Sequence, residues 1–119
     1  MSYLPKFKIY NDAYSIALEI YSVTRGFPIA EQFGITSQLR RAGYSIPSNI
    51  AEGYRKRTAK EKIHFYTIAI CSIEECIFFL SLSIDLGYII QTTLLEKLDS
   101  LAKSIHAYCK AIRINPKNT

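Results

Sequence analysis

The chain of 119 residues contains little of what marks fibrous, disordered or disulfide-rich proteins. It has no tryptophan, one methionine, five glycines and four prolines, with no repeat and no low-complexity tract. Collagen-like and largely disordered chains are excluded, because their compositions are dominated by glycine and proline or by uncompensated charge. The cysteines Cys71, Cys76 and Cys109 are odd in number, widely spaced and set among apolar residues. We expect them to be buried free thiols in a reducing compartment.

Long hydrophobic runs are also missing. The residues up to Ile9 alternate between polar and apolar and lack the apolar core of a signal peptide. The most apolar run, from Cys76 to Ile84, is nine residues long, roughly half of the ~20 that a membrane span needs. We therefore expect a cytoplasmic protein that is neither exported nor inserted in a membrane.

Helical periodicity is what the chain does contain. Apolar residues make up 49% of it, enough for one hydrophobic core without metals or disulfides. They recur at the three- and four-residue spacing of a helical face in four segments, 12–25, 31–56, 59–86 and 93–113. No strand pattern of comparable length competes. Because the connections are short, the sequence predicts an all-α fold, a single antiparallel up-down four-helix bundle domain over residues 1–119.

Several residues are expected to cap these helices. Asn11 or Asp12 is a candidate cap for the first helix. The segments Thr58–Glu61 and Thr93–Glu96 both have the capping-box spacing, in which the threonine and the glutamate each bond the other's backbone amide. They predict the starts of the third and fourth helices.

Pro47 interrupts the second helical pattern. A proline inside a helix removes one hydrogen bond, here to the carbonyl of Gly43, at a cost of about 3 kcal/mol. The apolar phase continues unchanged across Pro47, which favours one helix kinked at this residue. Two helices, with Pro47 in the first turn of the second, remain the alternative, because proline is favoured in a first turn.

The third predicted helix is apolar on nearly all sides. Phe65 and Tyr66 begin two separate apolar stripes, and Phe78 stands among the polar residues of the remaining stripe. Each helix of a four-helix bundle normally keeps one wet face, so this helix carries more apolar surface than one bundle buries. We expect self-association into a homo-oligomer that covers the excess. The alternative is that aromatic residues elsewhere, such as Phe27 or Phe33, fold over it.

Arrangements that carry out catalysis are scarce. Glu61 and His64 have the spacing that supplies two ligands to a di-iron site in a helical bundle, but a second Glu-x-x-His is missing. We interpret Glu61 as a capping residue and His64 as a half-exposed side chain. Neither Cys71 nor Cys76 has a cation nearby in sequence to activate it, and no glycine-rich phosphate loop occurs. We therefore expect a protein that is not an enzyme and that holds no metal or cofactor.

Positive charge is concentrated in one stretch. The net charge of the chain is +5. The segment from Arg40 to Lys62 holds seven basic and two acidic residues, a local charge of +5, so the charges of the remaining residues sum to zero. The seven are Arg40, Arg41, Arg55, Lys56, Arg57, Lys60 and Lys62. With Tyr44 and Tyr54 interleaved, they are expected to form one surface that contacts the phosphate backbone of RNA or DNA.

A solvated helix face is the alternative interpretation of this basic segment. Glu52 would then pair with Lys56, and Glu61 with Arg57, each contact contributing about 0.2–0.5 kcal/mol. The protein would in that case be a structural or protein–protein interaction scaffold with no nucleic-acid role.

The segment from Gln38 to Gly53 (QLRRAGYSIPSNIAEG) closely resembles the signature of the 23S rRNA intervening-sequence proteins, the four helix bundle protein family. The resemblance continues in FYTIA at 65–69, SIEE at 72–75 and LGYI at 86–89. It implies antiparallel four-helix bundles that associate as homopentamers, some of them encoded within bacterial large-subunit ribosomal RNA genes. A related accessory protein of diversity-generating retroelements binds nucleic acid. The resemblance therefore adds a reverse transcriptase or a ribosome-related protein as candidate partners, and it carries over no catalytic residues.

Overall fold

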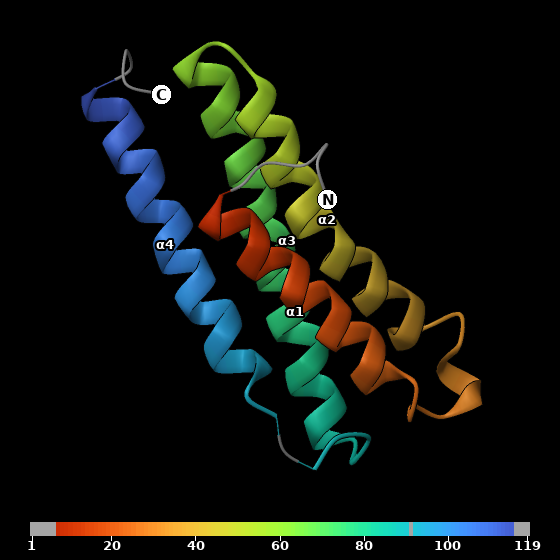
Figure 1. The fold of residues 1–119 in the computed structure, drawn as a ribbon. Helices are drawn as coiled ribbons and strands as arrows, with labels where there is room; N and C mark the ends of the chain where they lie inside the picture. The colour runs from red at the N-terminus through yellow and green to blue at the C-terminus, as the bar shows by residue number, and fades with distance from the viewer. Residues whose placement is uncertain (1–6, 91, 116–119) are drawn as a thin grey trace.

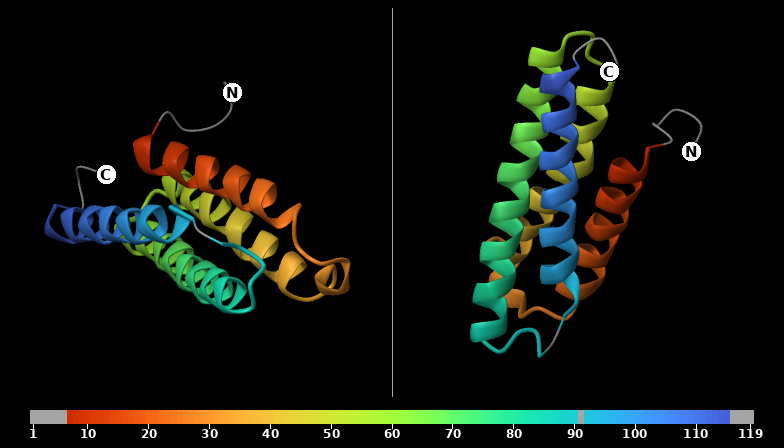
Figure 2. Two further views of the ribbon diagram at one scale, coloured as in Figure 1. Left: turned by 90° about the horizontal axis from the view of Figure 1, so that it is seen from below. Right: turned by 90° about the vertical axis from the view of Figure 1, so that its left-hand side faces the viewer.

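A computed structural model describes residues 7–90 and 92–115 of the chain. These residues form four α-helices, α1 (Lys8–Thr24), α2 (Ile35–Arg55), α3 (Ala59–Asp85) and α4 (Leu94–Ile114), and a 3-10 turn, η1 (Ile29–Glu31). Successive helices run in opposite directions and pack side by side (Figure 1). Helix α4 also lies against α1, which closes the bundle (Figure 2). The predicted all-α four-helix bundle is confirmed.

The core is built from one apolar stripe of each helix. These stripes are fully buried along the bundle axis, and α2 and α3 share the most extensive interface. The largest fully buried members of the core are Ile20, Leu39, Ile46, Ile50, Tyr66, Ile73, Leu80, Leu94, Leu98, Ile105 and Ile112. Helical periodicity in the sequence therefore identified the buried faces of α1, α2 and α4, because each of these helices has one apolar stripe to bury against its neighbours. The buried face of α3 was not identified, because its sequence is apolar on nearly all sides.

Helix α1 begins earlier than its expected caps. Its N-cap residue is Phe7, which offers no side-chain cap, and Asn11 and Asp12 lie inside the helix. Lys8 donates to Asp12 at 2.7 Å, an i,i+4 ion pair that favours the added turn. The Phe7 ring also packs against Tyr54 with 5.5 Å between centroids. The expectation of Asn11 or Asp12 as the cap was wrong, because tertiary contacts of Phe7 and an ion pair extend the helix.

The two capping boxes have different outcomes. Thr58 Oγ1 accepts a hydrogen bond from the Glu61 amide at 3.2 Å, which confirms the start of α3. Thr93 makes no side-chain cap, because its own backbone is already in the helical region. Thr92 Oγ1 instead accepts from the Leu94 amide at 3.1 Å. The start of α4 was correct to one residue, but the capping residue was wrong.

Helix α2 runs without interruption through Pro47, whose side chain is buried. The two-helix alternative was therefore wrong, and a kink at Pro47 stays a prediction. The expected start at residue 31 was also wrong, because Ile29–Glu31 form the separate 3-10 turn and α2 begins at Ile35. Glu31 Oε1 accepts from the Ile35 amide at 3.3 Å, so the turn itself caps the helix.

Helix α3 is the most apolar element. Its 27 residues include an 18-residue stretch with a mean hydropathy of 1.8, so by length and composition alone α3 could cross a membrane. The nine-residue run from Cys76 did not indicate this. The core helix of a soluble bundle has the same composition, and the buried side chains of α3 pack against α2 and α4. Phe78 stays 59% exposed. Among the described residues, the Phe27 ring contacts Tyr88, and the Phe78 ring contacts only its neighbour Phe79, so no ring contact joins Phe27 or Phe33 to this part of α3. Cys71 is exposed on α3, contrary to expectation, whereas Cys76 and Cys109 are buried.

Candidate nucleic-acid interface

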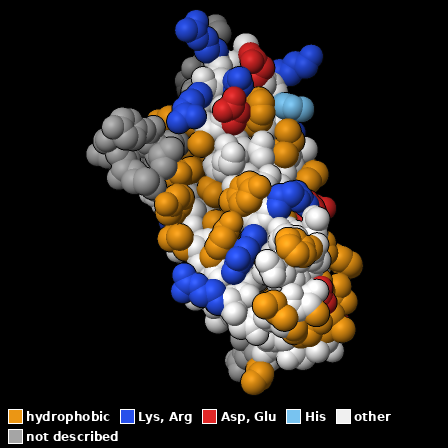
Figure 3. All heavy atoms as spheres, turned by 90° about the vertical axis from the view of Figure 1, so that its right-hand side faces the viewer, with side chains coloured by type: hydrophobic (Ala, Val, Ile, Leu, Met, Phe, Trp, Pro, Cys, Tyr) orange, Lys and Arg blue, Asp and Glu red, His pale blue; other side chains and the backbone are white. Residues whose placement is uncertain are grey.

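The connection between α2 and α3 carries the densest positive charge. Four cations lie within six residues, and we call them the basic turn: Arg55, Lys56, Arg57 and Lys60. Arg55, Arg57 and Lys60 are exposed, and Lys56 is partly buried. In the space-filling view, Lys and Arg side chains lie at this end of the molecule beside Asp and Glu side chains, and further Lys and Arg side chains lie along the same face (Figure 3). The capped start of α3 holds the turn in place, so the charges have a defined position on the bundle.

One of the two ion pairs expected at the basic turn is present. Lys56 Nζ lies 3.5 Å from Glu52 Oε1, and the same ammonium lies 5.2 Å from the centre of the Phe65 ring. Glu61 instead accepts a hydrogen bond from Thr58 Oγ1 at 2.9 Å. Within the described part of the chain, Arg55, Arg57 and Lys60 have no carboxylate within ion-pair distance. Their charges are therefore not neutralised by the fold.

Lys62 is placed differently from the basic turn. Its side chain is buried, with 5% of the residue exposed, and Nζ donates to the carbonyl oxygens of Tyr54 at 2.9 Å and Gly53 at 3.3 Å. Both carbonyls belong to the last turn of α2, where helix carbonyls lack their usual partners four residues ahead. The Gly53 carbonyl also accepts from the Lys56 amide at 3.2 Å. Burial lowers the pKa of the Lys62 ammonium. Its position four residues before the buried Tyr66, on the core stripe of α3, is the sequence signal that separates it from its neighbours.

Arg40 and Arg41 lie on opposite flanks of α2. Arg40 Nε donates to Thr24 Oγ1 at 2.8 Å, and its guanidinium stacks 4.7 Å from the centre of the Tyr21 ring, so it is bound to α1. Arg41 forms an ion pair with Glu75 of α3. Both lie about 20 Å along α2 from the basic turn at ~1.5 Å per residue. The structure therefore does not bring all seven predicted cations onto one surface.

The helical spacing of Arg41, Ser45, Ser48, Glu52 and Arg55 predicts a polar stripe along α2, and this stripe packs partly against α3. Ser72 Oγ of α3 donates to Ser45 Oγ at 2.9 Å, and Asn49 Nδ2 donates to the Ser45 carbonyl at 2.8 Å. These bonds satisfy polar groups at the helix interface, so this part of the stripe stabilises packing and is not free to bind a ligand. Tyr44 and Tyr54 keep about half of their surface exposed beside the charged residues.

A family model described as 23S rRNA-intervening sequence protein matches residues 5–110. The chain belongs to this family. No curated protein matches it. Among solved structures it is similar to a protein of unknown function from the S23 ribosomal protein family of Bacteroides thetaiotaomicron, with 24% identity, a TM-score of 0.68 and coverage of 87% of this chain and 96% of that one. This likeness shows the fold and leaves the function open.

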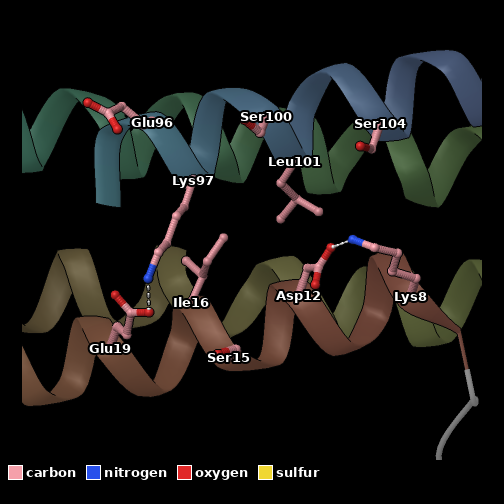
Figure 4. Close-up of a pocket in the computed structure, with 10 residues that line it drawn as sticks. All are labelled: Lys8, Asp12, Ser15, Ile16, Glu19, Glu96, Lys97, Ser100, Leu101 and Ser104. Carbon is pink, nitrogen blue, oxygen red and sulfur yellow. Dashed lines mark hydrogen bonds and ion pairs between the residues drawn. The ribbon is translucent and has the colours of Figure 1, made fainter. Parts of the chain in front are cut away.

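A polar groove separates α1 from α4 in this member of the intervening-sequence family (Figure 4). It has a volume of about 410 Å³, and its charged lining residues include two ion pairs, Lys8 with Asp12 and Lys97 with Glu19. The other lining residues are Ser15, Ile16, Glu96, Ser100, Leu101 and Ser104. Among the described residues, no group of three His, Cys, Asp or Glu side chains lies close enough to hold a metal ion.

Exposed apolar side chains gather on α1, α2 and α3. Leu18 and Phe78 are each 59% exposed, and Tyr44 is 53% exposed. A second groove of about 360 Å³ lies between α1 and α2 and is lined mainly by tyrosine, alanine, leucine and proline. Orange side chains cover much of the face seen in Figure 3. Among the described residues of α4, the only large apolar side chain that is exposed is Ile114, so the apolar surface is one-sided.

Proposed function

We propose that this intervening-sequence protein binds the phosphate backbone of RNA or DNA through the basic turn and catalyses no reaction. The observation that carries the proposal is the exposure of Arg55, Arg57 and Lys60 without carboxylate partners among the described residues. Three unpaired cations on one connection attract a polyanion, and flexible lysine and arginine side chains suit phosphate contacts better than the reading of bases.

Tyr54 supports a single-stranded ligand. Its ring is 47% exposed and lies in the last turn of α2, next to Arg55. An exposed aromatic ring beside cations offers a base a stacking surface while the phosphates are neutralised. Contacts of this kind tolerate many sequences, so the proposed binding depends on charge more than on base identity.

Self-association is the second part of the proposal. The apolar surface of α1, α2 and α3, with Phe78 and Leu18 projecting from it, is the surface that a second copy would cover. The family resemblance suggests a cytoplasmic homopentamer. In such an assembly the basic turn is repeated in each subunit, so that weak individual contacts with one nucleic acid add through multivalency.

A protein-binding scaffold is the alternative function, and the same apolar surface favours it. In that case the partners are proteins, such as a reverse transcriptase or a ribosome-related protein, and the basic turn contributes solubility only. The two functions differ in whether the purified protein binds nucleic acid at low salt.

Fluorescence anisotropy with a labelled single-stranded RNA tests the proposal. Binding measured at ~50 mM and ~200 mM salt should weaken steeply with salt, as phosphate contacts require. The variant Arg55→Ala/Arg57→Ala/Lys60→Ala should bind more weakly and with a smaller salt slope. Arg25→Ala/Lys97→Ala/Lys103→Ala removes the same charge elsewhere and should keep the slope. Absence of binding by the unmodified protein at low salt would overturn the proposal and favour the scaffold.

A further inference from the structure

The C-terminal end of α4 lies beside the turn between α2 and α3 (Figures 1 and 2). Ring contacts of Tyr108 hold the end of α4 in this position. The Tyr108 ring centre is 5.5 Å from that of Tyr66 in α3 and 5.2 Å from that of Phe7. Phe7 in turn contacts Tyr54 of α2 at 5.5 Å. An aromatic cluster therefore joins residues of all four helices or their caps at one end of the bundle, directly beneath the basic turn.

Lys110 and Arg113 follow Tyr108 on α4 and so lie at this same end. Both side chains are exposed. No carboxylate of the described residues lies within ion-pair distance of either. About fifty residues separate them from the basic turn in the sequence, and only the folding of α4 against α3 brings them to it. The sequence did not single out these two cations, because the residues outside Arg40–Lys62 carry no net charge when taken together.

The opposite end of the bundle has the contrary charge. The acidic residues in the second half of α1, around η1, at the end of α3 and at the start of α4 are Glu19, Glu31, Asp85, Glu96 and Asp99. Among the described residues of that end, the basic ones are Arg25, Arg40 and Lys97, fewer than the five carboxylates. Lys97 is paired with Glu19, and Arg40 is bound to Thr24 and Tyr21. The neutral sum outside Arg40–Lys62 therefore conceals a separation of charge along the bundle. A polyanion is drawn to one end and repelled by the other.

We propose that Lys110 and Arg113 bind nucleic-acid phosphates together with the basic turn, so that one strand lies across the end of the bundle from the α2–α3 connection to α4. The proposal deepens, and rests on, the proposed nucleic-acid function. Neighbouring helix axes in a bundle are about 8–10 Å apart, a distance that one strand crosses within a few nucleotides. Cations on both sides of that span neutralise successive phosphates of the same strand.

The test compares two double variants of α4 in the anisotropy titration with labelled single-stranded RNA. Lys110→Ala/Arg113→Ala should reduce the slope of log affinity against log salt by about 1.4, since each phosphate contact with a single strand contributes ~0.7. Affinity at low salt should fall several-fold. The matched control, Lys97→Ala/Lys103→Ala, removes two charges from the same helix away from this end and should leave the slope unchanged. Lys110→Arg/Arg113→Lys keeps both charges and should also keep the slope.

The possible outcomes separate this inference from the proposed function. Unchanged slope and affinity in Lys110→Ala/Arg113→Ala, with binding by the unmodified protein intact, would overturn the inference and leave the function standing. An equal loss in the control variant would also overturn it, because net charge and not position would then decide the affinity. No binding by the unmodified protein would remove the proposed function itself. Equal far-UV circular dichroism and melting temperature show that the exposed substitutions leave the fold intact.

Discussion

The backbone of Gly53 in α2 lies directly against the ring of Tyr66 in α3. A β-carbon at Gly53 would come within 2.7 Å of Tyr66 Cε1 and within 3.2 Å of the Lys62 carbonyl oxygen. Only glycine permits this approach, and it brings the last turn of α2 within reach of the Lys62 ammonium. The contact therefore positions the end of α2 and, two residues later, the first cation of the basic turn.

Gly53→Ala should lower the free energy of unfolding by about 1–3 kcal/mol, because the new methyl group overpacks a buried interface against a ring and a backbone atom. Urea denaturation monitored by circular dichroism measures the change. Gly26→Ala is the control, since the nearest atom to its β-carbon is 3.9 Å away. Equal stability of Gly53→Ala and the unmodified protein would contradict the close approach.

Lys62 and Lys60 should respond in opposite ways to replacement by alanine. Lys62→Ala should cost about 1–2 kcal/mol of stability, because two carbonyls at the end of α2 lose a charged donor, while the salt slope of RNA binding stays unchanged. Lys60→Ala should leave stability unchanged and reduce the slope, since its side chain is exposed. Thermal melts and anisotropy titrations of both variants test this. A loss of slope in Lys62→Ala at unchanged stability would show that the ammonium binds phosphate after all.

Stability should fall in alkaline solution. Burial raises the pKa of the Cys76 thiol to about 12 and raises that of the Tyr66 hydroxyl as well. The folded protein therefore holds these protons more tightly than the unfolded chain, and the stability present below about pH 9 is lost progressively as the pH rises toward 12. Urea midpoints at about pH 8 and about pH 10 measure the loss. Cys76→Ala should show a smaller difference between the two pH values, and an undiminished difference would assign the effect to other groups.

Assembly should depend on Phe78. Phe78→Glu places a charge on the exposed apolar surface of α3 and should shift the mass in light scattering from a multiple of 13.6 kDa toward that of one chain. Ile114→Glu makes the same chemical change on α4, outside this surface, and should leave the mass unchanged. A monomeric unmodified protein at micromolar concentration would contradict self-association.

Thiol labelling gives a second view of the same surface. Cys71 is exposed on α3, whereas Cys76 and Cys109 are buried. In dilute native protein a maleimide should modify Cys71 alone, and all three thiols should react after denaturation. If a second copy covers the outer face of α3, as proposed, labelling of Cys71 should slow as the protein concentration rises. A rate independent of concentration would place the contact between subunits elsewhere.

Local patterns in the sequence predicted the helices well, and the errors occurred where distant residues intervene. The Thr58–Glu61 capping box marked the start of α3 correctly, because both partners belong to one turn of chain. The start of α1 was missed, because Phe7 is held by aromatic rings of α2 and α4. The unbroken apolar phase correctly predicted that α2 continues through Pro47, because the burial of this apolar face outweighs the loss of a single hydrogen bond.

The sequence by itself determined the number and order of the helices and the buried faces of α1, α2 and α4, because helical periodicity is a local property of the chain. Only the tertiary structure decided which side of the apolar helix α3 is buried. The sequence also located the whole basic turn, because its four cations are neighbours in sequence. Only the tertiary structure decided which cations are available: Lys62 is buried against the end of α2, and Arg41 is paired with Glu75 of α3. Tertiary structure likewise brought the last turn of α4, which contains Arg113, to the basic end, because the neighbours of a charge depend on helices far away in the chain (Figure 2).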